Sequence, residues 1–450
     1  MTRVQNMTRG KPLSLIVSFA LPLMVGNIFQ QLYTVVDTMV VGKALGVQAL
    51  AALGATDWLN WMMLGIIQGL TQGFAILMAQ EFGAQKTENL RHVVGGSAVL
   101  SAASAAVLVA AGQLAARPVL VLLQTPPEIL ENALLYLRIM FFGIPIVMAY
   151  NLLASVLRSL GDGRTPLHAM IVASAVNIGL DILFVLGFQW GIAGAAAATL
   201  IAQLISSLFC LWHIGKIEML KLGREHFQIK PAMAGKLLAL GSPMAFQNGI
   251  ISVGGMIVQS VVNGFGVIFI AGFTATNKLY GVLEVAATSY GYSMITYTGQ
   301  NLGAGQITRI REGMRAALIV ALATSLVIMT VMLTGGRLIL GCFISGTPQE
   351  VEETMQIAYF YLAVMSVFLP VLYILHVVRS AIQGMGNTVL PMVSGIAEFV
   401  MRTGTALLLP AVIGERGIFY AEIMAWIGAD VILISSYFVT IRRTERMFGR

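Results

Sequence analysis

Charged residues are scarce in this 450-residue sequence, where Asp, Glu, Lys and Arg together make up only 10% of the chain. A soluble protein carries about a quarter of its residues as these four types. The chain therefore has too little charge to cover a surface that faces water, and 57% of its residues are hydrophobic. These proportions indicate that its natural solvent is lipid.

Cysteines and catalytic motifs are also scarce. The two cysteines, Cys210 and Cys342, fall in different halves of the chain and suggest neither a disulfide framework nor a metal site. No His-Glu-x-x-His helix, Gly-x-Ser-x-Gly elbow or P-loop is found. We therefore expect no enzyme, no ATP-driven pump and no bound cofactor. The first apolar run is too long for a cleavable signal peptide.

The hydropathy pattern predicts twelve membrane-spanning helices. A helix needs roughly 20 mainly apolar residues to cross the hydrocarbon core, and stretches of that length recur along the whole sequence. The predicted spans are 13–41, 48–79, 93–116, 132–156, 166–188 and 192–215, then 237–262, 267–298, 314–340, 355–378, 388–412 and 417–441. We expect bends within the second and the eighth.

The distribution of basic residues predicts the orientation of these spans. If the N-terminus is cytoplasmic, twenty of the 27 Lys and Arg residues lie on the cytoplasmic side, and only Lys43, Arg117, Arg337 and Arg416 lie opposite. This is the positive-inside asymmetry. Both termini are therefore expected in the cytoplasm. The excess of Lys and Arg over Asp and Glu is explained by this membrane topology and does not indicate a nucleic-acid partner.

An internal repeat divides the chain into two similar halves. Eight residues recur at a constant offset of 220. They are Gly46, Ala51, Ala55, Thr56, Gln80, Gly83, Ala84 and Arg91, repeated as Gly266, Ala271, Ala275, Thr276, Gln300, Gly303, Ala304 and Arg311. Six spans per copy give both copies the same orientation, with a substrate path between them. We predict an N-lobe over 1–215, a cytoplasmic linker over 216–236 and a C-lobe over 237–450.

Duplicated motifs resemble one transporter family. A Gln-x-x-Gly-Ala step leaves an even-numbered span in each half, at 80–84 and 300–304. Val36-Asp37-Thr38 lies on the first helix, and Arg158-Ser-Leu-Gly-Asp-Gly-Arg-Thr-Pro166 follows the fourth. Together these motifs resemble the multidrug and toxic compound extrusion (MATE) family over essentially the whole chain, and in particular its bacterial DinF-like branch. The resemblance implies an all-α membrane protein with two pseudo-symmetric six-helix bundles.

Acids within predicted spans are functional candidates, because a charge at mid-membrane is costly. Asp37 ends a polar stripe on the first helix, and Asp181 lies one turn after Asn177 on the fifth. The stripe also contains Gln30, Gln31 and Thr34, which we predict to face protein, water or substrate.

Asp37, Asn177, Asp181 and Thr199 are similar to the N-lobe cation site of bacterial MATE transporters. The resemblance implies that these residues handle the coupling H+, or that Asp37, Asn177 and Asp181 ligate Na+ as a metal site. Both ions use the same buried oxygens. The C-lobe position that matches Asp181 is Gly404, so we expect a single cation site.

Three residues of the second half are candidate substrate ligands. Glu284 follows Tyr280 by one turn, and an acid beside an aromatic ring suits an organic cation. An ion pair with Lys278 is the structural alternative. Glu398 and Arg402 lie at i and i+4, so an internal ion pair is at least as good an explanation of Glu398 as substrate binding.

We expect a secondary transporter of the bacterial plasma (inner) membrane that works as a monomer among lipids. It would exchange H+ or Na+ for small amphipathic or cationic molecules by alternating access. The alternative is a flippase for a lipid-linked saccharide, which would need a more cationic cavity. The acids inside the spans outnumber the bases there and argue against it.

Overall fold

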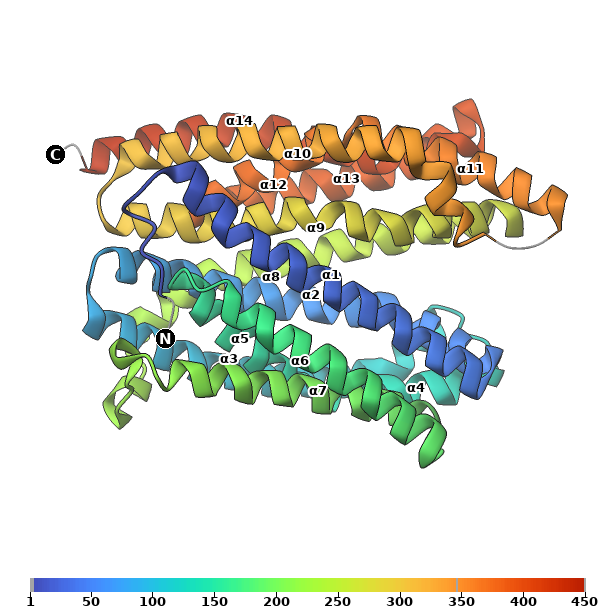
Figure 1. Cartoon of the computed structure of the whole chain (residues 1–450), viewed down its shortest axis with the longest axis horizontal. Coiled ribbons are helices and arrows are strands. Elements are labelled where there is room, and N and C mark those ends of the chain that lie inside the picture. Colours follow the sequence, from blue (N-terminus) through green and yellow to red (C-terminus); the bar gives the residue numbers. More distant parts are fainter. Residues whose placement is uncertain (1–3, 345–346, 449–450) are drawn as a thin grey trace. The chain divides into compact units, whose positions relative to one another are not determined.

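The computed structural model describes residues 4–344 and 347–448, and within that part the chain consists of helices and contains no strand. The predicted all-α fold class is confirmed. Two compact units are formed. Unit 1 contains Met1–Met7 and Leu21–Ala245, and unit 2 contains Thr8–Ala20 and Phe246–Arg450. Each unit is a bundle of long helices (Figure 1).

Unit 1 is built around α5, which packs against α2, α3 and α7. Its complete helices are α2 (Val47–Gly83), α3 (Thr87–Leu122), α4 (Pro127–Phe142), α5 (Ile144–Ser159), α6 (Arg164–Asp181), the π-helix η1 (Ile182–Gly187) and α7 (Gly191–Ile214). Two short 3-10 turns follow, η2 (Glu218–Leu220) and η3 (Arg224–Phe227). Both turns pack on α3, so the segment after α7 lies against its own unit.

Unit 2 is built around α9, which packs against α10, α11 and α12. Its complete helices are α9 (Val267–Gly303), α10 (Ile307–Gly341), α11 (Pro348–Val367), α12 (Leu369–Gly384), α13 (Val389–Ile413), the 3-10 helix η4 (Glu415–Tyr420) and α14 (Ala421–Phe448). The α14 helix packs against α13 and α12. These contacts bring α9, α12, α13 and α14 into one bundle, which holds the polar residues of this unit.

Two helices contribute to both units, α1 (Pro12–Leu45) and α8 (Pro231–Val262). The beginning of α1 belongs to unit 2, where the Ser293 hydroxyl donates to the carbonyl of Ile16 over 3.1 Å. The beginning of α8 belongs to unit 1. The compact units thus divide inside α1 and α8, whereas the predicted linker, 216–236, lies wholly within unit 1.

The predicted spans coincide with the helices. By length and composition, nine helices of the described chain can cross a membrane, or eleven spans if each of two bent pairs counts as one. The remaining predicted span, 267–298, coincides with the 37-residue α9.

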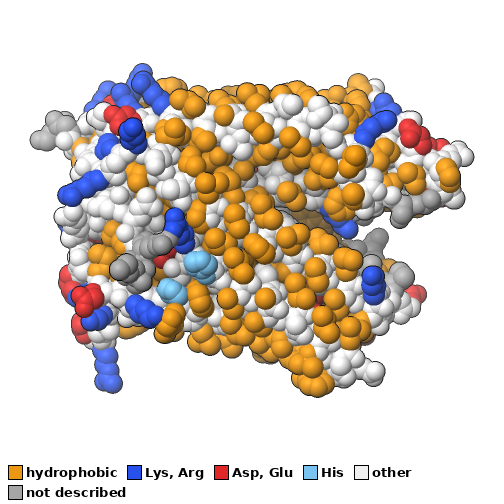
Figure 2. Space-filling view, viewed as in Figure 1, with side chains coloured by type: hydrophobic (Ala, Val, Ile, Leu, Met, Phe, Trp, Pro, Cys, Tyr) orange, Lys and Arg blue, Asp and Glu red, His pale blue; other side chains and the backbone are white. Residues whose placement is uncertain are grey.

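Apolar side chains such as Leu114 and Ile319 are 79% and 67% exposed. Hydrophobic side chains cover the visible helix surfaces, and Lys and Arg gather mainly near helix ends (Figure 2). The chain is a multi-pass membrane protein.

Two helix breaks lie outside the spans in which bends were expected. The second and eighth spans, where bends were expected, form the uninterrupted helices α2 and α9. The breaks lie instead between α4 and α5, with an angle of 47°, and between α11 and α12, with an angle of 48°. Each following helix has a proline in its first turn, Pro145 and Pro370. Proline lacks the amide hydrogen and clashes with the preceding turn, so a helix readily breaks there.

Candidate functional site

The predicted cation site lies in unit 1, where α1, α6 and α7 supply its residues. Asn177 and Asp181 are one turn apart on α6 and are 1% and 0% exposed. The α6 and α7 helices pack together, and the Asn177 amide donates to the Thr199 hydroxyl over 3.5 Å. Asp37, on α1, has its carboxyl beside that of Asp181. All four predicted residues therefore belong to one cluster.

This cluster contains acceptors without donors. Oδ1 of Asp37, Oδ1 of Asn177 and both carboxylate oxygens of Asp181 are buried and have no hydrogen-bond partner among the described residues. Buried charges are stable only when they are paired or neutralised. A proton shared between the two carboxyl groups would supply the missing donor. A hard cation such as Na+ would also fit, because such ions take oxygen ligands from carboxylates and amides.

Two tyrosines border the cluster, and the sequence interpretation did not include them. Tyr33 lies one turn before Asp37 on α1, interacts with Gln30 and Thr34, and is within electrostatic range of both carboxyl groups. Tyr136 on α4 is 8% exposed and lies within the same range. The i, i+4 spacing of Tyr33 and Asp37 was a usable signal. Nothing in the sequence connected Tyr136 to α1.

The polar stripe on α1 remains a predicted substrate surface. Gln30 and Gln31 are half-buried and Thr34 is exposed. The Thr34 hydroxyl donates to the carbonyl of Gln30 over 3.0 Å, so its hydrogen is used within the helix. Its oxygen keeps acceptor capacity. The two amide side chains are the better direct ligands.

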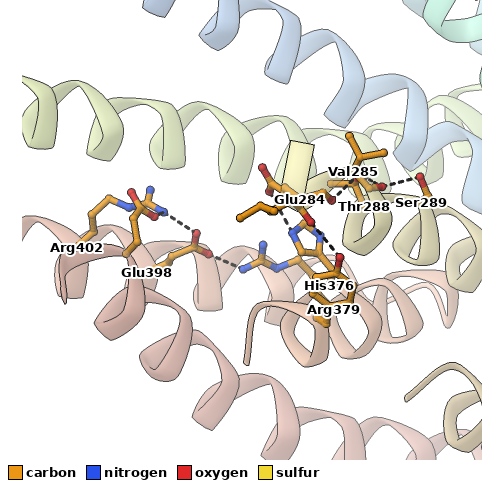
Figure 3. Close-up of polar contacts among 11 residues, drawn as sticks. Glu284, Val285, Thr288, Ser289, His376, Arg379, Glu398 and Arg402 are labelled. Carbon is orange, nitrogen blue, oxygen red and sulfur yellow. Dashed lines mark hydrogen bonds and ion pairs between the residues drawn. The ribbon is translucent and has the colours of Figure 1, made fainter. Parts of the chain in front are cut away.

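In unit 2, Glu398 lies between two arginines (Figure 3). Its Oε2 accepts from Arg379 over 2.6 Å and its Oε1 accepts from Arg402 over 3.1 Å. The Glu398 and Arg402 residues are 4% and 5% exposed. Arg402 also donates to Glu422 over 2.7 Å. The ion pair expected from the i, i+4 spacing is present, and it is part of a four-residue network whose members are buried except for the half-buried Glu422.

The sequence interpretation missed much of this network. Arg379 lies one residue beyond the tenth predicted span, and Glu422 on the last helix was given no role. Asp430 of α14 is 7% exposed, and its Oδ1 has no partner among the described residues. Only the contacts of α12 and α14 with α13 place these groups around Glu398, so spacing along the sequence carried little signal.

Glu284 is paired with His376 rather than with Lys278. His376 Nε2 lies 3.3 Å from the Glu284 carboxylate, whose side chain is 33% exposed (Figure 3). Tyr280, one turn earlier on α9, stacks on Trp426 with ring centroids 6.1 Å apart. Glu284 therefore combines a nearby aromatic face with an accessible carboxylate, whereas Glu398 is enclosed by its arginines.

A bundle of long apolar helices with acids buried inside it is typical of a multi-pass membrane transporter and not of a soluble enzyme. The MatE family model matches residues 22–183 and 243–408, which together make up more than half of the chain. The chain belongs to the MatE family. The resemblance to the MATE family and the prediction that the chain is not an enzyme are both confirmed.

Individual relatives agree with this assignment. The chain is 29% identical over 417 residues to the probable multidrug resistance protein YpnP of Bacillus subtilis strain 168, covering 92% of each protein. It is 28% identical over 374 residues to DNA damage-inducible protein F of Escherichia coli strain K12, covering 78% of this chain and 76% of the relative.

The fold of the chain is similar to that of solved structures. One of them, the outward-facing conformation of a multidrug resistance MATE family transporter, matches with a TM-score of 0.90 at 21% identity, covering 99% of each chain. This similarity confirms the two-lobe MATE fold. The relatives do not favour a flippase for lipid-linked saccharides.

Proposed function

We propose that the chain is an antiporter of the bacterial inner membrane, in which inward movement of H+ or Na+ drives an amphipathic organic cation out of the cell. The observation that supports this proposal best is the group of buried, donor-free oxygens on Asp37, Asn177 and Asp181. Two carboxyl groups enclosed by apolar helices need a positive species to compensate them. A transported H+ or Na+ would provide that compensation reversibly.

Cation binding can control the transport cycle through charge. When the cluster holds a proton or Na+, the Asp37 and Asp181 pair carries less negative charge and the two side chains attract each other. When the cation leaves, the carboxylates repel, and α1 and α6 are pushed toward a different packing. Pro22 lies inside α1 and removes one backbone hydrogen bond there, which makes a change in helix shape less costly.

Each unit has accessible polar side chains that could bind a substrate. Gln30 and Gln31 offer adaptable hydrogen bonds in unit 1, and Glu284 offers a partly exposed carboxylate beside Tyr280 in unit 2. A carboxylate with a neighbouring aromatic ring attracts organic cations. Relatives of this chain carry the name multidrug resistance protein, which agrees with a broad set of such substrates.

The placement of the protein in the membrane is part of this proposal. The excess of Lys and Arg on one side supports cytoplasmic termini. One chain contains both halves of the repeated unit, so we propose that the monomer is the working form. Lipid surrounds the exposed apolar side chains, and no nucleic acid takes part.

Transport in liposomes tests the proposal directly. Purified protein is reconstituted with an internal fluorescent organic cation, and efflux is followed under an imposed pH or Na+ gradient at clamped membrane potential. Efflux should be driven by one of the two gradients, which then identifies the coupling ion. Asp37→Asn and Asp181→Asn should each reduce gradient-driven efflux by at least about tenfold, because neither amide can exchange a proton or carry charge.

Asp57→Asn is the matched control. The Asp57 side chain lies on α2 of the same unit and is exposed, so this variant should transport at close to the normal rate. If folded Asp37→Asn and Asp181→Asn proteins pump as well as the control, the proposed coupling site is wrong. If neither gradient moves the dye in the unmodified protein, the proposed substrate class is wrong, and anionic and lipid-linked molecules become the next candidates.

A further inference from the structure

A second cluster of ligating side chains lies in unit 1, away from the acids of α1 and α6. Glu88 and His92 are one turn apart at the beginning of α3, and His226 lies in η3, the short turn that packs on α3. One ligand atom from each residue lies within 4.8 Å of the other two. We propose that these three side chains form a Zn2+ site that fastens the segment between α7 and α8 to α3.

The distances suit a tetrahedral ion. Oε1 of Glu88 lies 2.8 Å from Nε2 of His226 and 3.9 Å from Nε2 of His92. Two ligands that each lie about 2.1 Å from tetrahedral zinc are about 3.4 Å apart. The two separations from Glu88 lie on either side of that value, and the two histidine nitrogens lie within 4.8 Å of each other. Small side-chain movements would bring all three atoms into coordination, with water as the fourth ligand.

The two carboxylate oxygens of Glu88 face different partners, and this leaves one of them available to a metal ion. Oε1 of Glu88 faces both histidines, whereas its Oε2 faces Arg91 at 3.3 Å. Arg91 also donates to the carbonyls of Met219 and Glu218, over 3.0 and 3.3 Å. The arginine is thereby held on the far side of the carboxylate. It supports the segment after α7 without occupying the ligand atom that the metal needs.

His226 is buried with its Nε2 atom facing Glu88, and the tautomer that the present hydrogen bonds favour must change before Nε2 can ligate a metal. It is only 3% exposed, and the backbone N–H of Gly223 donates to its Nδ1 over 2.7 Å, which leaves a proton on Nε2 for Glu88 to accept. On zinc binding this proton would move to Nδ1, and the bond from the Gly223 N–H would have to break, because a protonated Nδ1 can no longer accept it. Two acceptors are already close to Nδ1, the Gly223 carbonyl at 3.3 Å and the Glu225 carboxylate at 3.4 Å. A carboxylate or carbonyl behind a ligating histidine is the usual outer partner in zinc sites.

Two glycines allow this arrangement. A Cβ atom on Gly95 of α3 would overlap the carbonyl oxygen of His226, and one on Gly223 would overlap the Glu225 carboxylate. The close approach of η3 to α3 therefore depends on the missing side chain at Gly95. The position of the outer carboxylate likewise depends on Gly223. The arrangement of the three ligands therefore also depends on backbone contacts at these two glycines.

Metal binding to the purified full-length protein tests the proposal without any transport measurement. The protein carries a tag that lacks histidine, is stripped with a chelator, and is titrated with Zn2+ by calorimetry. Co2+ is used in parallel as a spectroscopic probe. We expect one Zn2+ per chain and a Co2+ spectrum typical of tetrahedral nitrogen and oxygen ligands. Trypsin cleavage after Lys221 and Arg224 should slow when zinc is present.

Variants separate the site from other binding. His92→Ala and His226→Gln should each weaken zinc binding by more than the about 10- to 100-fold that loss of an outer partner costs, and Glu225→Gln should fall within that range. His168→Gln, an exposed histidine of the same unit, is the matched control and should bind zinc normally. The proposal is overturned if the unmodified protein binds no zinc. It is also overturned if folded His92→Ala protein binds zinc as tightly and remains equally protected from trypsin.

Discussion

Gly69 of α2 and Ala245 of α8 approach so closely that a Cβ atom on Gly69 would lie 2.5 Å from the Cα atom of Ala245. One turn further along α2, a Cβ atom on Gly73 would overlap the backbone of Gly241. The two helices therefore meet through their backbones. Small residues allow such close approach in membranes, where packing rather than water exclusion drives helix association. This contact fixes the beginning of α8 in unit 1.

Adding a methyl group at this contact should destabilise the fold. Gly69→Ala and Gly73→Ala place a Cβ against backbone atoms that cannot rotate away, and overpacking of this kind typically costs about 1–3 kcal/mol. We expect a lower melting temperature in detergent for both variants, measured by intrinsic fluorescence during heating. Gly54→Ala is the matched control, because a Cβ at that position of α2 has no neighbour within 4 Å.

The control should melt at the same temperature as the unmodified protein or slightly higher, because alanine favours a helix over glycine. A Gly73→Ala protein that melts with the control would show that α2 and α8 do not meet in this way.

The positions of the apolar spans could be predicted from the sequence because hydropathy depends only on composition along the chain. The 220-residue repeat likewise revealed two halves. The positions of the helix breaks, in contrast, could not be predicted from the sequence. Pro22 and Pro370 are both visible prolines, yet α1 continues through Pro22 and the chain breaks between α11 and α12 just before Pro370. Whether a proline breaks or only interrupts a helix depends on neighbouring helices.

The candidate site shows the same division between local and tertiary information. Asp37, Asn177 and Asp181 could be selected because acids and amides are costly in an apolar span. The partners of Glu284 and Glu398 could not be selected completely. His376 and Arg379 reach them from α12, a different helix. Which side chains pair across helices is determined by how the helices pack, and this cannot be predicted from a single sequence.

The buried network around Glu398 should contribute to stability more than Glu284 does. In Glu398→Gln, Arg379 loses the carboxylate at 2.6 Å and Arg402 loses one of its two carboxylate partners. Removing one partner of a buried ion pair typically costs about 3–5 kcal/mol, because a charge is left uncompensated. We expect a clear fall in melting temperature. Glu284→Gln should change it little, because that side chain is a third exposed.

A double variant checks the cause of this effect. Replacing Arg379 with Gln in the Glu398→Gln protein removes the stranded charge together with its partner. The double variant should therefore be less destabilised than the sum of the two single variants. Additive effects, or equal melting temperatures for Glu284→Gln and Glu398→Gln, would contradict a network held by charge.

The beginning of α11 should lose protection at low pH. The Thr347 backbone N–H donates to the Glu350 carboxylate over 3.0 Å and the Thr347 hydroxyl does so over 2.8 Å, and these bonds lower the pKa of Glu350, which lies outside the predicted span. A lowered folded pKa means that the stabilisation is complete well above the ordinary Glu pKa of about 4.3 and is lost as pH falls through the folded value. Amide hydrogen exchange in the first turn of α11, corrected for the intrinsic effect of pH, should therefore accelerate on acidification.

In Glu350→Gln the exchange should be faster at neutral pH and should no longer respond to acid. The matched control is Glu353→Gln, a change at an exposed neighbour, which should behave like the unmodified chain. Identical pH responses in Glu350→Gln and the unmodified protein would exclude the carboxylate as the cap of this helix.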